Sequence, residues 1–201
     1  IGLFLTKDAL AKWWIVSEFR EQGMDARIGQ LEIGFPLNST VSAYDVTIWN
    51  LPEYGGAPML KIDRLFIDCD FSELMNVRRK LKPHFRLVSI DITEFNLVET
   101  KGGARNLISL PDAVAKSSAQ LALGESPLYF TISTLTFSWE RLKFSHLADT
   151  GKSRDVNINI EDYTVQEVEK LSDLRPLFDR IATKVTWKVL LNKLFGRLFG
   201  D

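Results

Sequence analysis

The sequence predicts an α+β domain in which a long, bent, antiparallel β-sheet of about six strands is flanked by an N-terminal and a C-terminal helix. Three observations support this fold class. Apolar residues recur at helical spacing near both ends, they alternate with polar residues between positions 26 and 164, and the alternation changes phase inside three strands. With 201 residues the chain is long enough for one domain with a substantial core. We predict a single domain at 1–201, with the N-terminal helix within 1–23, the sheet at 26–164 and the C-terminal helix at 165–201.

The first helix is predicted from Thr6 to Gln22, because apolar side chains recur there at three- and four-residue spacing. Gly23 follows directly and is typical of the position after a helix. The helix contains the adjacent Trp13 and Trp14. Their side chains either pack on the sheet or lie at a membrane interface, where tryptophan is enriched.

The strands are predicted from apolar residues that alternate with a period of two. A first strand contains Leu31, Ile33 and Phe35, and a second spans about Val41 to Trp49. The further strands are predicted at 59–71, 87–99, 128–139, 142–147 and 156–161, the last two forming a hairpin across the turn at 149–152.

Three of these strands change phase in the middle. The switches fall near Ile62, near Thr93 and near Ser133. One extra residue in a strand, a β-bulge, moves every later side chain to the other face of the sheet. Three switches in neighbouring strands therefore predict one bend shared across the sheet.

The C-terminal helix is predicted from Leu177 to Phe199, with Ser172 or Asp173 as the cap and Pro176 in the first turn. After Val189 its apolar residues cover most of the circumference: Leu190, Leu191, Leu194, Phe195, Leu198 and Phe199. A helix that is apolar on all sides is buried by its own protein, by a partner or by lipid. We expect it on or near the concave face of the sheet, which it either fills or leaves open to a ligand.

Composition excludes several classes of protein. The single cysteine, Cys69, rules out an intramolecular disulfide and a cysteine-based zinc site within the chain. A net charge of −1 argues against a nucleic-acid-binding protein, which normally carries a basic excess. The 45% hydrophobic content argues against disorder.

The sequence contains no pattern that predicts catalysis. Its two histidines, His84 and His146, do not occur in HExxH spacing, and GxSxG, GxxxxGK[ST] and GxGxxG motifs are absent. Asp63, Asp68 and Asp70 could suggest a cation site, but alternation places Asp63 on the face opposite the other two. We therefore predict a protein that is not an enzyme, with no catalytic residue, no metal site and no cofactor.

Six segments in the first half of the chain resemble a pattern shared by AsmA-like bacterial envelope proteins, the group that includes TamB and the DUF748-type chains. These segments are Arg27–Ile33, Asp45–Leu51, Leu60–Leu65, Phe71–Leu74, Leu87–Ile92 and Asn106–Leu107. The resemblance covers about half of the chain and consists mainly of strand alternation. It implies a curved β-groove with an apolar inner face, located in the periplasm and tethered to the inner membrane. It also implies a role in lipid traffic and outer-membrane assembly, and no catalytic residues.

Together the phase switches and the resemblance favour a membrane-anchored periplasmic domain that binds lipid or another apolar ligand in cell-envelope biogenesis or maintenance. The anchor is expected in a segment that precedes Ile1. The apolar wall of the groove is expected at Ile67, Ile90, Ile92, Phe130 and Ile132. Membrane or partner contacts are expected at Trp13, Trp14, Leu190, Leu194, Phe195, Leu198 and Phe199. The alternative is a structural or accessory subunit that holds no ligand and docks on a membrane or an envelope protein.

Overall fold

A computed structural model of the chain describes residues 2–21, 23–34, 39–69, 83–106 and 127–184. Its helices are α1 (Gly2–Glu21) and α4 (Arg175–Lys184). Its strands are β1 (Ala26–Arg27), β2 (Gln30–Ile33), β3 (Thr40–Trp49), β4 (Pro58–Cys69), β5 (His84–Glu99), β6 (Pro127–His146) and β7 (Arg154–Lys170). Three short 3-10 turns follow β3, β6 and β7, at Pro52–Tyr54 (η1), Thr150–Lys152 (η3) and Leu171–Leu174 (η4).

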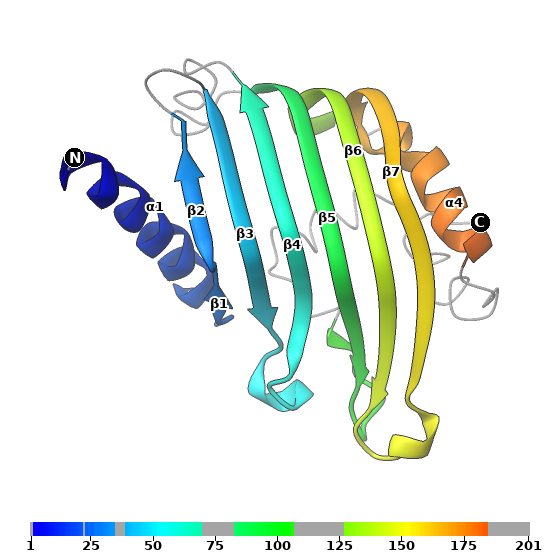
Figure 1. Cartoon of the computed structure of the whole chain (residues 1–201). Coiled ribbons are helices and arrows are strands. Elements are labelled where there is room, and N and C mark those ends of the chain that lie inside the picture. Colours follow the sequence, from blue (N-terminus) through cyan, green and yellow to red (C-terminus); the bar gives the residue numbers. More distant parts are fainter. Residues whose placement is uncertain (1, 22, 35–38, 70–82, 107–126, 185–201) are drawn as a thin grey trace.

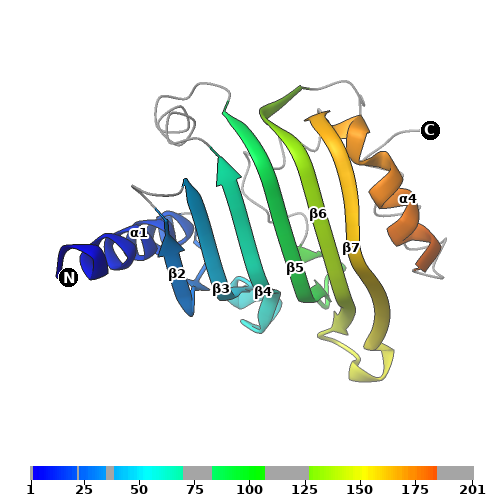
Figure 2. The ribbon, with the colours of Figure 1, turned by 45° about the horizontal axis from the view of Figure 1, so that its top comes forward.

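The strands form one sheet in the order β1-β3-β4-β5-β6-β7, and β2 also pairs with β3 (Figure 1). The two helices lie at opposite edges of this sheet, α1 beside β1 and β2 and α4 beside β7 (Figures 1 and 2). The predicted α+β class, with a helix at each end of a large sheet, is confirmed. The first helix begins at Gly2, four residues before the predicted start at Thr6.

One strand pair differs from the antiparallel prediction. β5 and β6 are parallel, with His84 paired to Thr131 and Glu99 paired to His146. A parallel pair needs a connection of a dozen or more residues, and residues 100–126 supply that length. The strands predicted separately at 128–139 and 142–147 are the two halves of β6, and the second half forms the predicted hairpin with β7.

A line of irregular pairing, which we call the first crease, crosses the sheet. Between β4 and β5 the register shifts on both sides of Ile62, which leaves Thr93 as an extra residue on β5 and Asp63 as one on β4. Between β6 and β7 it shifts twice around Trp139, and each shift places one extra residue on β7. On β6 the residue beside Thr93 is Glu140, because the β5–β6 register is unbroken.

The first crease continues to the β1–β2 edge. Gly29 separates β1 from β2 and lies against Asp45 of β3, which has a positive φ of 52°. A Cβ on Gly29 would stand 2.7 Å from the Cβ of Asp45, so only glycine fits at this point.

A second crease crosses β5, β6 and β7 closer to the start of β5. Buried residues normally alternate, but here the core-facing positions jump by three residues: Phe85 to Val88, Ile132 to Leu135 and Val165 to Val168. In β7 the jump contains Glu167, which has a positive φ of 52°. The predicted switches at Ile62 and Thr93 lie on the first crease, and the one at Ser133 lies on the second. A single shared bend is therefore corrected to two, because the parallel pairing places Ser133 beside Arg86 and not beside Thr93.

The main core cluster joins β5, β6 and β7 to α4. Ile158 and Val168 of β7 are completely buried, and α4 contributes Leu177 and Ile181. The described part of the C-terminal helix therefore packs on the sheet of its own chain. The apolar positions predicted after Val189 lie outside the described residues. A smaller cluster of Ile28, Leu31 and Ala43 packs against α1.

Candidate functional site

Between the two creases the sheet is regular and its two faces differ sharply. Two rows of paired residues across β3–β7 carry apolar side chains, and we call the surface they form the apolar face. The rows are Ala43–Leu65–Ile90–Phe137–Tyr163 and Val41–Ile67–Val88–Leu135–Val165. The row between them, Ser42–Phe66–Ser89–Thr136–Thr164, belongs to the opposite face, because side chains alternate along each strand. We call that side the polar face.

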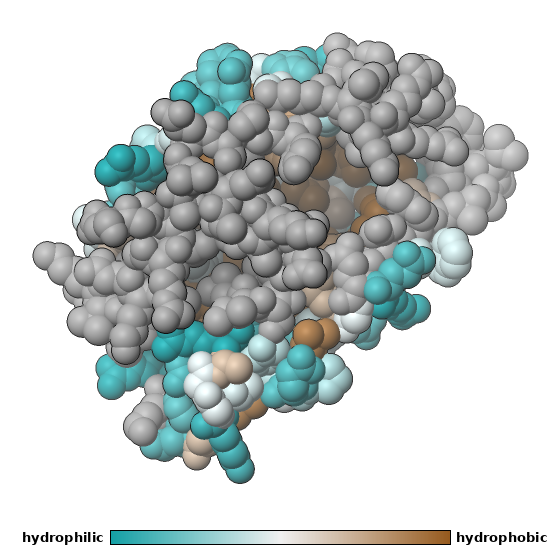
Figure 3. All heavy atoms as spheres, turned by 180° about the vertical axis from the view of Figure 1, so that it is seen from behind, coloured by the Kyte–Doolittle hydropathy of each residue, from teal (hydrophilic) through white to brown (hydrophobic). Residues whose placement is uncertain are grey.

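Two of the five predicted wall residues, Ile67 and Ile90, lie in the rows of the apolar face. Both side chains are half-buried, and Ile90 packs against the main core cluster. Figure 3, which views the molecule from behind, shows hydrophobic residues of the described part of the chain near the middle of this view.

The other three predicted wall residues lie at or beyond the creases. Ile132 is 6% exposed and belongs to the core cluster, so it supports the sheet from within. Phe130, two residues earlier, is 36% exposed, and its ring centre lies 6.0 Å from that of Phe85. Ile92 lies on the first crease, where it pairs with Ile62 and Trp139. The structure therefore brings together Ile67 and Ile90 and places the remaining three around them.

Among the predicted contact residues, Trp13 is 67% exposed. Ala11 and Ile15 on the same helix pack against the cluster beside β2. Residues two apart on a helix differ by about 200° in direction, so Trp13 points away from the sheet. The side chain of Trp14 lies outside the described set, as do the contact residues predicted after Val189: Leu190, Leu194, Phe195, Leu198 and Phe199.

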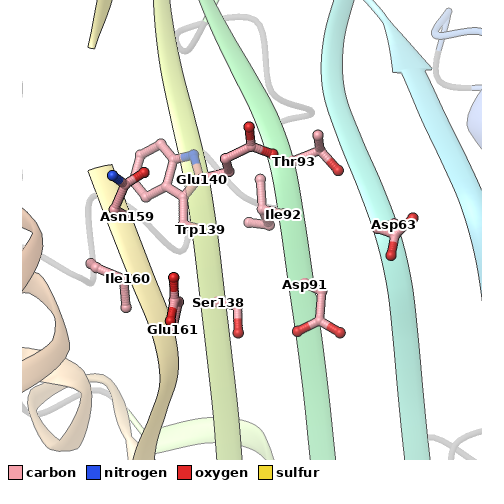
Figure 4. A pocket seen from close by; sticks show the side chains of 10 residues that line it. All are labelled: Asp63, Asp91, Ile92, Thr93, Ser138, Trp139, Glu140, Asn159, Ile160 and Glu161. Atoms are coloured by element: carbon pink, nitrogen blue, oxygen red, sulfur yellow. The ribbon is translucent and has the colours of Figure 1, made fainter. Parts of the chain in front are cut away.

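The first crease also forms a depression of about 400 Å³ that carries four carboxylates (Figure 4). The four carboxylates belong to Asp63 of β4, Asp91 of β5, Glu140 of β6 and Glu161 of β7, all labelled in Figure 4. The other lining residues are Ile92, Thr93, Ser138, Trp139, Asn159 and Ile160. No lysine or arginine is among the lining residues, although Arg141 Nη2 lies 3.6 Å from Oε1 of Glu140. Across the described ranges no group of acidic, histidine or cysteine side chains has the arrangement of a metal site.

Asp63 and Asp68, two of the three aspartates that could suggest a cation site, lie in different surroundings. Asp63 lines the crease depression, whereas Asp68 forms a salt bridge of 2.6 Å with Arg86. Asp70 lies outside the described residues. The four acids of the depression come from strands far apart in the sequence, and no local spacing relates them.

Both histidines are hydrogen-bonded within the chain. His84 reaches β6, with Nδ1 2.8 Å from Thr131 Oγ1 and Nε2 3.1 Å from Ser133 Oγ. His146 accepts a hydrogen bond at Nδ1 from the N–H of Asp149, and its Nε2 lies 3.5 Å from Glu99.

Three buried asparagines, Asn50, Asn96 and Asn106, meet at the end of the sheet where β3 and β5 finish. We call them the asparagine cluster. Asn106 Nδ2 donates to Asn50 Oδ1 at 2.6 Å and to the Asn96 carbonyl at 2.7 Å. Asn96 Nδ2 donates to the carbonyl of Pro58, and Ser145 Oγ donates to Asn96 Oδ1.

No helix in the described ranges is both long and apolar enough to cross a bilayer. In the comparisons with known proteins, no family model, no curated protein and no solved structure matches the chain.

Proposed function

We propose that this protein is a non-catalytic binding domain whose apolar face holds an acyl chain or another elongated apolar ligand. The observation that carries the proposal is the apolar face itself, whose two rows of paired residues run across β3–β7. Phe130 adds an aromatic side chain with 36% of its surface exposed close to the start of the same strand that carries Leu135 and Phe137. Four of the ten residues in these rows are buried, and the other six keep part of their surface exposed. Partly exposed apolar side chains gathered on one face are characteristic of a binding surface for apolar molecules.

The contrast between the two faces limits where such a ligand binds. The polar face carries hydroxyl side chains at Ser89, Thr136 and Thr164, and Thr134 donates a hydrogen bond to Gln166 on the same side. A hydrocarbon chain gains roughly 25 cal/mol for each Å² of apolar surface removed from water, and only apolar surroundings provide that gain in full. The apolar face is therefore the expected contact surface.

The likeness of the strand segments to AsmA-like proteins supports a cellular setting for this binding. We infer a periplasmic domain attached to the inner membrane that takes part in cell-envelope biogenesis or maintenance. In that setting phospholipids and free fatty acids are the apolar molecules with chains of suitable shape.

A pair of variants tests the proposal. Phe130→Ser removes an apolar side chain from the expected ligand surface, and Leu147→Ser removes one of similar exposure, 40%, from the β6–β7 turn. We expect Phe130→Ser to weaken the binding of a fluorescent fatty acid about tenfold, since part of a phenylalanine side chain contributes about 1.4 kcal/mol on burial. Leu147→Ser should leave the affinity unchanged. Equal affinities for the two variants and the natural protein, or no uptake by any of them, would exclude this ligand site.

The alternative function is an accessory subunit that docks on a membrane or an envelope protein and holds no ligand. The observation that favours it is Trp13, which is 67% exposed on the side of α1 that faces away from the sheet. If α1 docks on lipid, Trp13→Ala should abolish co-sedimentation with phosphatidylethanolamine–phosphatidylglycerol vesicles and leave fatty-acid uptake intact. Undiminished co-sedimentation would remove α1 from the membrane contact.

A further inference from the structure

The hydrogen bonds of the asparagine cluster determine which way each amide points. The N–H of Val98 donates to Asn106 Oδ1 at 3.0 Å, so the other end of that amide must be the NH₂ group. That NH₂ group donates both to the Asn96 carbonyl and to Asn50 Oδ1. Asn50 therefore directs its Oδ1 atom toward Asn106, and its own NH₂ group points away from Asn106. Rotating either amide by 180° would bring two donors or two acceptors together.

The NH₂ group of Asn50 is left without an acceptor in the described part of the chain. Asn50 is 5% exposed, and its Nδ2 atom makes no hydrogen bond. A buried donor without a partner costs about 1–3 kcal/mol, and such groups are rare in folded proteins. The position therefore calls for an acceptor.

A small cavity lies beside Asn50. It measures about 10 Å³ and is lined by Met24, Trp49, Asn50, Leu51, Tyr54, Met59 and Asn106. This is the volume open to the centre of a water-sized sphere, and it leaves room for a water molecule. Its lining contains no lysine or arginine to hold an anion, and a metal cation would face the hydrogens of the Asn50 NH₂ group.

We propose that this cavity binds a single water molecule, which accepts a hydrogen bond from Asn50 Nδ2. The oxygen of Asn106 offers a position to which the water can donate, since a carbonyl oxygen has two lone pairs and one accepts the Val98 N–H. The water completes a polar network that ties the residue after β3 to the segment after β5. It acts as a fixed part of the fold at this end of the sheet.

A crystal structure of the whole chain that resolves ordered waters tests the proposal. We expect one isolated density peak at hydrogen-bond distance, about 2.7–3.2 Å, from Asn50 Nδ2. An empty cavity, or a protein oxygen bonded to that nitrogen, would overturn it.

Nuclear magnetic resonance gives an independent readout of how long the water stays. The side-chain NH₂ of Asn50 should show water cross-peaks of opposite sign in nuclear and rotating-frame Overhauser spectra, which marks a long-lived bound water. Two other asparagines serve as controls. The NH₂ of Asn96 donates to the carbonyl of Pro58 and should show no such pair, whereas Asn159 is exposed and should show only the same-sign peaks of surface water. Same-sign or absent peaks at Asn50 would contradict a bound water.

Discussion

The replacement of Asn106 by alanine removes the centre of the asparagine cluster and should strongly destabilise the fold. Its side chain makes three hydrogen bonds, with the N–H of Val98, the carbonyl of Asn96 and Oδ1 of Asn50, at 3.0, 2.7 and 2.6 Å. Those three partner residues are 2%, 3% and 5% exposed, so bulk water does not reach them freely. Each group left unpaired costs about 1–3 kcal/mol, and the lower end of that range for three groups gives a loss of about 3 kcal/mol.

The free energy of unfolding of Asn106→Ala can be measured in urea, with the fluorescence of the five tryptophans as the signal. Asn157→Ala is the matched control, since Asn157 is exposed on β7 and its loss should change stability by less than about 0.5 kcal/mol. The dependence of the unfolding free energy on urea should stay constant if only the native state is affected. A loss below about 1 kcal/mol would show that water replaces these bonds freely, and would refute the inference that the asparagine cluster holds the sheet end together.

Three further substitutions test the fold elsewhere. Asp173 Oδ2 accepts hydrogen bonds from the N–H groups of Glu169 and Lys170; burial acts to raise its pKa, but these bonds and the charge of Lys170 outweigh it and lower the pKa. The ionised carboxylate therefore stabilises the fold above about pH 4, and this stabilisation is lost as the pH falls through the lowered pKa. When the unfolding free energy is measured from neutral to acid pH, Asp173→Asn should lose less stability than the natural protein. Identical acid dependence of the unfolding free energy in the two proteins would contradict this role. Glu167→Gly should raise the unfolding free energy by up to about 1 kcal/mol, because φ at this position is 52° and glycine adopts this left-handed backbone without strain. A lower unfolding free energy would show that the Glu167 side chain stabilises the fold by more than its backbone strain destabilises it. Ile158→Ala should lower it by about 2–5 kcal/mol in the same urea assay, because the side chain is completely buried, and a loss under about 1 kcal/mol would remove Ile158 from the core.

Local alternation predicted the strands well but carried no information on their direction. The strand at 41–49 and the hairpin after His146 appear where period two predicts them. The parallel pairing of β5 and β6 depends on where residues 100–126 return the chain, and alternation inside each strand is the same for either direction.

The three phase switches marked two creases in the sheet, although the sequence pattern assigns all of them to one shared bend. Near Ile62 and Thr93 they located the first crease. In β6 the first crease lies at Glu140, and there the core-facing residues Trp139 and Leu142 are three positions apart instead of two. In the sequence this longer spacing predicted that one strand ends at 139 and another begins at 142. A bulge and a strand boundary both interrupt a period of two, so the sequence alone does not distinguish them.

The acidic depression and the asparagine cluster were missed because both depend on contacts between distant segments. Asn106 and Asn50 are 56 residues apart, and the four acids come from four strands. One signal was present: Asn96 lies between Phe95 and Leu97 in an apolar run. A polar residue in such a run needs a buried partner, although the sequence does not say which one.

Native mass spectrometry of the whole chain, purified without detergent from a bacterial host and followed by lipid extraction, tests the central claim most directly. If the apolar face holds a hydrocarbon chain, the spectrum should contain a species heavier than the protein by the mass of one phospholipid or fatty acid, and the extract should contain that molecule. Delipidated protein should regain the heavier species when fatty acid is added, and Phe130→Ser should regain less of it. A spectrum with the protein mass alone, before and after added fatty acid, would contradict the account.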